Sequence, residues 1–196
     1  RRMIEERCHR SGPAELLFVG NLIPRKGAHH LLAALAQISH SYWRLHIVGR
    51  ADVDPAYSAR LHQMIRRSGL LEQVQFHGQV SDAALRGLLR RVHLLAVPSY
   101  EGFGIVYLEA MAFGLPVIAS TAGAAQEIVE HGVNGFTVDP PDRPAFVQTL
   151  RICLESREAL AEMGAAARRV YDRHPTWAET GARIRDFLVQ QMQRQR

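Results

Sequence analysis

Lysine is almost absent from this 196-residue chain, because 23 of its 24 basic residues are arginine and only Lys26 is lysine. Lys26 lies in a loop between two glycines, Gly20 and Gly27. A compact ammonium and a planar guanidinium suit different ligands, so the position of this lysine indicates that a point charge is wanted in the loop. The alternative, that a single lysine stands there by chance, remains open.

Cysteine is also scarce, and Cys8 and Cys153 are too far apart to form a metal or redox motif. We therefore expect a reduced, cytoplasmic setting. No stretch reaches about 18 consecutive apolar residues, which excludes a membrane-spanning helix. Residues 1–8 carry charges with no apolar run after them, which does not fit a signal peptide. We expect the chain to be a fragment of a longer protein.

The charge balance is basic, with a net charge of +5 and a sequence pI of about 9.8. Such a balance favours anionic partners, although heavy arginine usage without any special partner explains it equally well. Nucleic acid is not expected, because the basic residues are spread out without aromatic residues between them. The arginine-rich tail at residues 176–196 suits an anionic surface, so peripheral contact with the inner membrane face is a further expectation.

Short apolar runs alternate with segments of helical periodicity along most of the chain. The runs predicted as strands are 15–20, 44–49, 74–77, 92–97, 116–120 and 135–138. The segments predicted as helices are 27–38, 55–68, 81–91, 105–113 and 123–130. This alternation predicts right-handed strand–helix–strand units, and therefore an α/β fold with a Rossmann-like, doubly wound parallel sheet. From residue 143 onward the pattern is helical throughout.

The chain divides into three predicted parts. Residues 1–13 are an inter-domain linker or N-terminal extension, residues 14–175 form the Rossmann-like domain, and residues 176–196 form a C-terminal helix with a basic tail. Ligands of doubly wound sheets bind at the carboxyl ends of the strands. The loops expected at that edge hold most of the glycines of the chain.

One of these loops, Glu101-Gly-Phe-Gly104, runs from a buried strand into a helix. Its glycines allow a ligand to approach the backbone closely, and the start of the helix offers N–H groups suited to phosphate. Glu101 and Glu109 bracket this phosphate site and would repel phosphate unless they bind hydroxyl groups. The pattern favours a nucleoside diphosphate sugar, whereas solvated or locally paired glutamates remain the alternative.

The loop that contains the only lysine has a similar position. Arg25 and Lys26 precede a predicted helix, where cations are electrostatically unfavourable. A bound diphosphate would offset this cost, and the alternative is an ordinary charged surface loop.

These residues resemble a known family. The segment from Glu101-Gly-Phe-Gly to Leu108-Glu-Ala-Met-Ala112 and Pro116-Val-Ile-Ala-Ser120 is similar to the "EGFG…LEAMA.G.PVIAS" signature of family 4 (group 1) glycosyltransferases. Phe18-Val-Gly-Asn-Leu-Ile-Pro-Arg-Lys-Gly27 is similar to the "VGRL.P.KG" loop of that family. Further segments at 46–49, 74–80 and 127–136 match in the same order, so the resemblance covers about residues 14–190.

The resemblance implies the C-terminal, donor-binding half of a GT-B fold, whose N-terminal acceptor-binding domain is not in this chain. It implies a retaining hexosyltransferase that uses a UDP-, GDP- or ADP-linked sugar, needs no cofactor or metal, and is inactive without the other domain. Lys26 and Glu101 would be catalytic. The donor would be bound at Gly20, Asn21, Arg25, Gly49, Val80, Gly102, Phe103, Gly104, Ile105, Val106 and Glu109.

Within that set the resemblance implies separate roles. Glu109 would bind the ribose hydroxyls, and Glu101 with the backbone of residues 102–104 would bind the sugar. The amides of Ile105 and Val106 would contact the diphosphate that Lys26 neutralises. The backbone near Val80 and Gly49 would border the base.

One departure concerns Asn21, because the family usually has arginine there. Arg25 is a possible substitute, and the departure points to an altered donor or weaker activity. Two further functions are therefore kept open. One is a non-catalytic nucleotide-sugar-binding or regulatory module, and the other is a related GT-B enzyme such as an epimerase. A GT-B phosphorylase is not expected, because its pyridoxal lysine would have to be Lys26, which lies in a phosphate loop.

Overall fold

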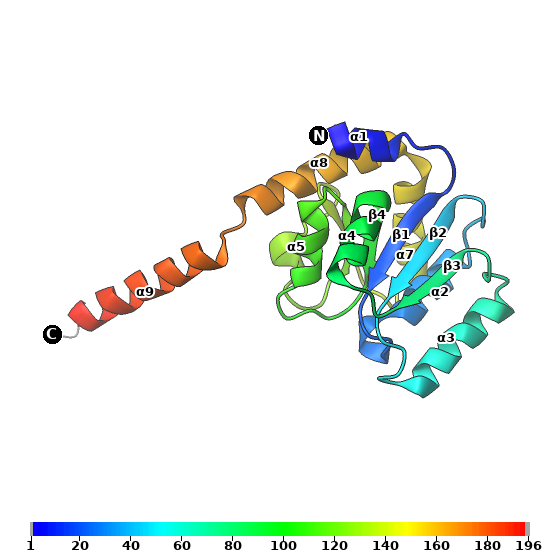
Figure 1. Cartoon of the computed structure of the whole chain (residues 1–196), viewed down its shortest axis with the longest axis horizontal. Helices are drawn as coiled ribbons and strands as arrows, with labels where there is room; N and C mark the ends of the chain where they lie inside the picture. The colour runs from blue at the N-terminus through cyan, green and yellow to red at the C-terminus, as the bar shows by residue number, and fades with distance from the viewer. Residues whose placement is uncertain (1, 195–196) are drawn as a thin grey trace.

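The computed structural model describes residues 2–194 and contains a central six-stranded parallel sheet (Figure 1). The strands are β1 (Ala14–Val19), β2 (Trp43–Val48), β3 (Val74–Gly78), β4 (Leu94–Val97), β5 (Val117–Ser120) and β6 (Gly135–Val138). Their order in the sheet is β3-β2-β1-β4-β5-β6, with parallel pairing throughout. This order is the doubly wound arrangement that the sequence predicts, so the predicted fold class is confirmed.

Helices connect and cover the strands. They are α1 (Arg2–Cys8), α2 (Ala28–Leu35), α3 (Pro55–Arg67), α4 (Asp82–Arg91), α5 (Ile105–Ala112), α6 (Ala125–Ile128), α7 (Arg143–Glu155), α8 (Arg157–Arg173) and α9 (Trp177–Arg194), with one 3-10 turn, η1 (Pro24–Lys26). Five of them begin at a polar side chain that accepts a backbone N–H, which satisfies one of the free donors of the first turn. Asp54 does so for α3, Ser81 for α4, Asp142 for α7, Ser156 for α8 and Thr176 for α9. The predicted cap at Ser81 is thus confirmed.

The core has two layers because successive side chains of a strand point to opposite faces of the sheet. Leu16 and Phe18 of β1 belong to an apolar cluster that the helices α2, α3 and α7 cover. Leu17 belongs to the second cluster, which α4 and α5 cover. Both faces of the sheet are therefore buried at the inner strands, which explains why these strands read as apolar runs, whereas the edge strand β3 is only partly buried.

Some boundaries differ from the sequence prediction. The strand predicted from residue 92 begins at Leu94, because the Val92 N–H still bonds to the Leu88 carbonyl and ends α4. The helix predicted at 27–38 begins only after Gly27, whose φ of +74° is left-handed, and α2 ends at Leu35. The predicted helix at 123–130 shortens to the single turn of α6.

Helix α1 was not predicted, and it packs against α8 and the base of the sheet. Arg7 is buried and donates to the carbonyls of Phe113 and Gly114, at 3.0 and 2.5 Å, just past the end of α5. The imidazole of His93 bridges the Glu15 amide and the Arg7 carbonyl. The start of the described chain is thus tied to the helix that begins at the candidate site. The proposed boundary between residues 13 and 14 stays a prediction.

Helix α9 extends away from the rest of the molecule (Figure 1). None of its residues is buried, although it carries several large apolar side chains, namely Trp177, Ile184, Phe187, Leu188, Val189 and Met192. Along residues 2–194, no helix combines the length and the apolarity needed to cross a membrane.

Candidate functional site

The sheet has a topological switch point between β1 and β4, where the strand order reverses. Ligands of doubly wound folds bind outside the carboxyl ends of the strands at such a point. The loops that follow the two strands are in close contact there. A Cβ atom on Gly27 would lie only 2.5 Å from the Pro98 carbonyl oxygen, so glycine is required for this approach.

The only lysine of the chain forms an ion pair across this switch point. Lys26 Nζ lies 2.5 Å from Glu101 Oε1, and the two side chains are only 17% and 16% exposed. The hydroxyl of Ser99, which is almost fully buried, donates to the same carboxylate oxygen. Two residues that the sequence assigned to chemistry on separate grounds are therefore in direct contact.

Arg25 does not join this pair. Its guanidinium donates to the Tyr100 carbonyl at 2.5 Å and is exposed. Arg25 thus fixes the backbone next to Glu101, while Lys26 holds the carboxylate. Adjacent residues of η1 reach the same loop at two different points.

A second loop supports the backbone of Glu101. The Ala124 amide donates to the Glu101 carbonyl at 3.0 Å, and Gly123 pairs with Glu101 in an isolated parallel bridge. Gly123 has a φ of +82°, and a Cβ there would lie 2.4 Å from the Glu101 carbonyl oxygen. Glu101 is therefore held through both its side chain and its main chain.

Helix α5 starts directly after this loop, and no side chain caps its N-terminus. Its N-cap, Gly104, has a φ of +79° and provides no side-chain acceptor. Within residues 2–194, the amides of Ile105 and Val106 donate to no carbonyl or side chain. Free N–H groups and the positive end of the helix dipole together form an anion site. Ile105 is 54% exposed, so this end of the helix is accessible.

Tyr107 explains why Gly104 must be glycine. Its buried ring lies under the loop, where a Cβ on Gly104 would come within 2.5 Å of Cδ2. Its hydroxyl donates to the Val97 carbonyl at 3.1 Å. Burial raises the pKa of this phenol, and the Glu101 carboxylate adds to the effect, so the hydroxyl stays a donor. The end of β4 and the first turn of α5 are thereby fixed relative to each other.

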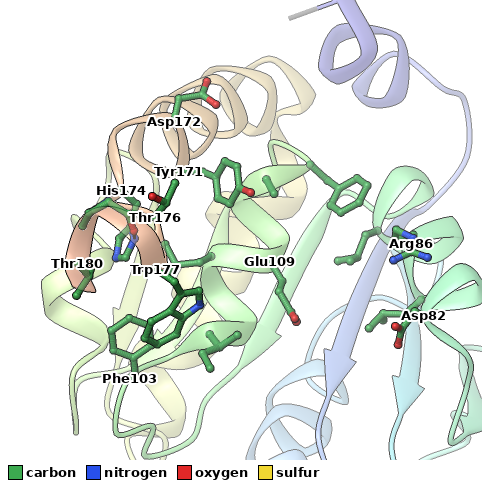
Figure 2. Close-up of a pocket in the computed structure, with 17 residues that line it drawn as sticks. Asp82, Arg86, Phe103, Glu109, Tyr171, Asp172, His174, Thr176, Trp177 and Thr180 are labelled. Atoms are coloured by element: carbon green, nitrogen blue, oxygen red, sulfur yellow. Dashed lines mark hydrogen bonds between the residues drawn. The ribbon is translucent and has the colours of Figure 1, made fainter. Parts of the chain in front are cut away.

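Glu109 lies on the next turn of α5 and points into an open groove of about 890 Å³ (Figure 2). The groove lies between α4 and the junction of α8 with α9, and Asp82 and Arg86 form its α4 side. Partial burial raises the pKa of the Glu109 carboxyl, and the negative charge of Asp82 raises it further. A carboxylate in this position gains from a ligand that donates hydrogen bonds to it.

The remaining predicted site residues lie at the same edge of the sheet. The Gly20 amide bonds to Val48, and the Gly49 amide bonds to Gly78, both at 2.9 Å. A Cβ on Gly49 would lie 1.9 Å from the Gly20 carbonyl oxygen, so the β1 and β2 ends touch through their backbones. Val80 follows β3 and is half-buried.

Three other predicted site residues are exposed, namely Asn21, Gly102 and Phe103. Asn21 is exposed, and its side chain makes no hydrogen bond in residues 2–194. Gly102 and Phe103 form the exposed tip of the Glu101 loop.

The sequence prediction missed two groups of contacts. Ser99 and Gly123 hold Glu101, and both follow strands at the switch-point edge, which is the only signal the sequence offered for them. Phe103 faces His174 and Trp177, with ring centroids 6.0 and 6.2 Å apart, so the Glu101 loop contacts the start of α9 (Figure 2). Nothing in the local sequence pattern pointed to that contact.

The residues that the structure describes contain no cluster of three or more histidine, cysteine or acidic side chains suited to a metal ion. One Asp-x-Asp sequence exists, Asp52-Val53-Asp54, in the loop after β2. Asp54 accepts the Tyr57 amide as the cap of α3, and Asp52 pairs with Arg50. Both carboxylates thus have structural partners.

Known proteins are similar to this chain in sequence and in structure. The sequence model of the family described as "Glycosyl transferases group 1" matches residues 2–170. The chain is 34% identical over 165 residues to the glycogen synthase of Mycobacterium tuberculosis, covering 82% of this chain and 38% of that protein. It is 34% identical over 177 residues to the phosphatidyl-myo-inositol mannosyltransferase of Mycobacterium leprae, covering 86% of this chain and 44% of that protein.

Among solved structures, Anabaena Alr3699/HepE in complex with UDP and glucose matches with a TM-score of 0.82 and 33% identity. The match covers 90% of this chain and 48% of that chain. This chain therefore spans less than half the length of each of these three relatives. The family match extends over most of the chain and includes the predicted site residues from Gly20 to Glu109. The chain belongs to the group 1 glycosyl transferases.

Proposed function

We propose that this chain is the donor-binding domain of a retaining glycosyltransferase that uses a nucleoside diphosphate sugar. The observation that carries the proposal is that three groups lie on or against the segment from Glu101 to the second turn of α5. They are the Lys26–Glu101 ion pair, the free amides of Ile105 and Val106, and the Glu109 carboxylate. A cation and a helix N-terminus suit a diphosphate, and carboxylates on either side suit hydroxylated groups.

Each group has one role in the proposed reaction. The amides of Ile105 and Val106 bind the diphosphate, Glu109 accepts the ribose hydroxyls, and Glu101 accepts sugar hydroxyls. The bond between the anomeric carbon and the diphosphate oxygen breaks, and its electron pair stays on the diphosphate. Lys26 stabilises that developing charge. The acceptor hydroxyl passes its proton to the leaving diphosphate oxygen and forms the new bond from the same face, which retains the anomeric configuration.

We propose further that an N-terminal acceptor-binding domain completes the active site. The relatives are more than twice as long as the matched region. No residue of α9 is buried, and Trp177 at its start is 78% exposed although it contacts Phe103. Large exposed apolar surfaces of this kind usually mark an interface. A cytoplasmic setting, with contact between the basic tail and an anionic membrane, belongs to the same proposal.

Asn21 supports a second function of another class, a non-catalytic nucleotide-sugar-binding module. This exposed amide without a hydrogen-bond partner replaces the arginine that the resemblance leads one to expect. Both functions predict donor binding, and they differ in turnover. Hydrolysis or transfer of donor sugar by the full-length protein supports the enzyme, whereas binding without either reaction supports the module.

Calorimetric titration of the chain with UDP, GDP and ADP, and with UDP-glucose and GDP-mannose, tests the proposal. We expect one nucleotide to bind, with affinity reduced about tenfold or more by Lys26→Ala or by Glu109→Gln, since each removes a hydrogen bond to a charged group. Glu155→Gln on α7, outside these loops, is the matched control for the loss of a carboxylate. A folded chain that binds none of the five ligands would overturn the proposal. Binding that both site variants leave unchanged would show that the site is elsewhere.

A further inference from the structure

Ser99 is a buried polar residue at the switch point, and the proposed reaction assigns no role to it. It is 1% exposed and lies two residues after the end of β4. The Ser99 amide donates to the Val97 carbonyl at 2.9 Å, and the Tyr107 hydroxyl lies 3.5 Å from the Ser99 carbonyl oxygen. The side chain is therefore fixed by the end of a core strand. Its hydroxyl donates to a single group, Glu101 Oε1.

The Glu101 carboxylate uses its two oxygens unequally. Oε1 accepts from both Lys26 and Ser99, while Oε2 accepts no hydrogen bond from the residues the structure describes. The proposed function assigns Lys26 to the diphosphate, and on that assignment its ammonium leaves Oε1 when the donor binds. After that change Ser99 is the remaining side-chain donor to this oxygen. A carboxylate that lost both donors would be free to rotate about its terminal torsion, which has a broad energy profile.

We propose that Ser99 is the positioning residue for Glu101: it holds Oε1 when Lys26 moves to the diphosphate, so that Oε2 stays aimed at the hydroxyls of the transferred sugar. The inference rests on the proposed function and adds a division of labour to it. Ser99 serves recognition of the sugar alone, whereas Lys26 serves the diphosphate. A serine with a merely structural role would contribute to stability without distinguishing a nucleotide from its sugar conjugate.

The test measures the sugar increment, defined as the Kd of the nucleoside diphosphate divided by the Kd of its sugar conjugate. Calorimetry with UDP against UDP-glucose, and with GDP against GDP-mannose, gives this ratio for the 196-residue chain. We expect Ser99→Ala to lower the ratio about fivefold or more while the Kd of the diphosphate alone changes less than twofold. Ser99→Cys, close in size but a weak donor, is expected to do the same.

Ser120→Ala is the matched control, because Ser120 is a buried serine at the end of the neighbouring strand β5. Its hydroxyl accepts the Ala122 amide and does not touch Glu101. We expect it to leave the sugar increment unchanged. An unchanged increment in the folded Ser99 variants would overturn the inference and leave the proposed function standing. If the unsubstituted chain binds no diphosphate at all, the proposed function fails and the inference fails with it.

Discussion

Replacing Gly123 with alanine tests how the candidate site is built, because it perturbs Glu101 from outside the loop. Gly123 has a φ of +82°, and left-handed backbone costs a residue with a Cβ about 1–2 kcal/mol. The added Cβ would also lie 2.4 Å from the Glu101 carbonyl oxygen, about 1 Å inside van der Waals contact. The atoms in conflict are backbone, so no side chain can rotate to relieve the clash.

The Glu101 segment must therefore move by about 1 Å, which stretches the Ala124–Glu101 hydrogen bond and the Lys26–Glu101 pair. We expect the free energy of unfolding to fall by about 2–3 kcal/mol, from the left-handed conformation together with one weakened buried hydrogen bond. Affinity for the donor sugar is expected to fall about tenfold or more, since misplacement on this scale disrupts positioned groups. Urea denaturation followed by circular dichroism measures the first effect, and calorimetry with UDP-glucose or GDP-mannose measures the second.

Gly132 provides a matched control with the same backbone strain. Its φ is +79°, and a Cβ there would meet no atom within 4 Å. Gly132→Ala should therefore cost only the strain of about 1–2 kcal/mol and leave donor affinity unchanged. If both variants lose the same stability and bind donor equally well, Gly123 does not position Glu101 and the reasoning is refuted.

Three further variants test separate features. Arg7→Met removes two hydrogen bonds to the end of α5 and should lower the free energy of unfolding by about 2–3 kcal/mol in urea denaturation, whereas exposed Arg10→Met should change it little. Burial, assisted by nearby Arg91, lowers the pKa of His46 to about 4. The neutral imidazole therefore contributes its full stability above pH 6.5, and this contribution is lost as the pH falls toward 4. His46→Gln should reduce the dependence of the urea midpoint on pH over that range. Because the pKa of the Glu109 carboxyl is raised, this group becomes protonated at a higher pH than an ordinary glutamate. Donor affinity should therefore begin to decline at that higher pH as the solution is acidified. Calorimetry should find this decline absent in Glu109→Gln. If the urea midpoint depends on pH as steeply in His46→Gln as in the unsubstituted chain, the role given to His46 is contradicted. If donor affinity declines equally in Glu109→Gln, the role given to Glu109 is contradicted.

The sequence predicted the sheet well because its inner strands are largely buried on both faces and stand out as apolar runs of four to six residues. The cap at Ser81 and the helix that follows residue 104 also depend on local chemistry, which the sequence contains. Local pattern failed at the strand start assigned to Val92, because an apolar residue fits the last turn of a helix as well as a strand. Which structure it joined was settled by the hydrogen bond to Leu88.

Helix α1 was missed for a different reason. Its seven residues are mostly charged, and the helix depends on tertiary contacts such as those of Arg7 with the end of α5. A long-range hydrogen bond across 107 positions leaves no trace in the local sequence.

Within the site, the sequence indicated Lys26 and Glu101 as separate residues but could not show their contact, since 75 positions separate them. The support from Ser99 and Gly123 is equally non-local. The family resemblance named the loops, and packing of the strand ends determined which atoms meet.

In the proposed function, a nucleoside diphosphate sugar binds at the start of α5, between Glu101 and Glu109. An NMR titration of the ¹⁵N-labelled chain with UDP-glucose and GDP-mannose locates the binding site residue by residue. We expect the largest saturable shifts at the amides of Gly104, Ile105 and Val106, with little change along α7. Saturable binding that shifts other regions and leaves these three amides unmoved would contradict the account.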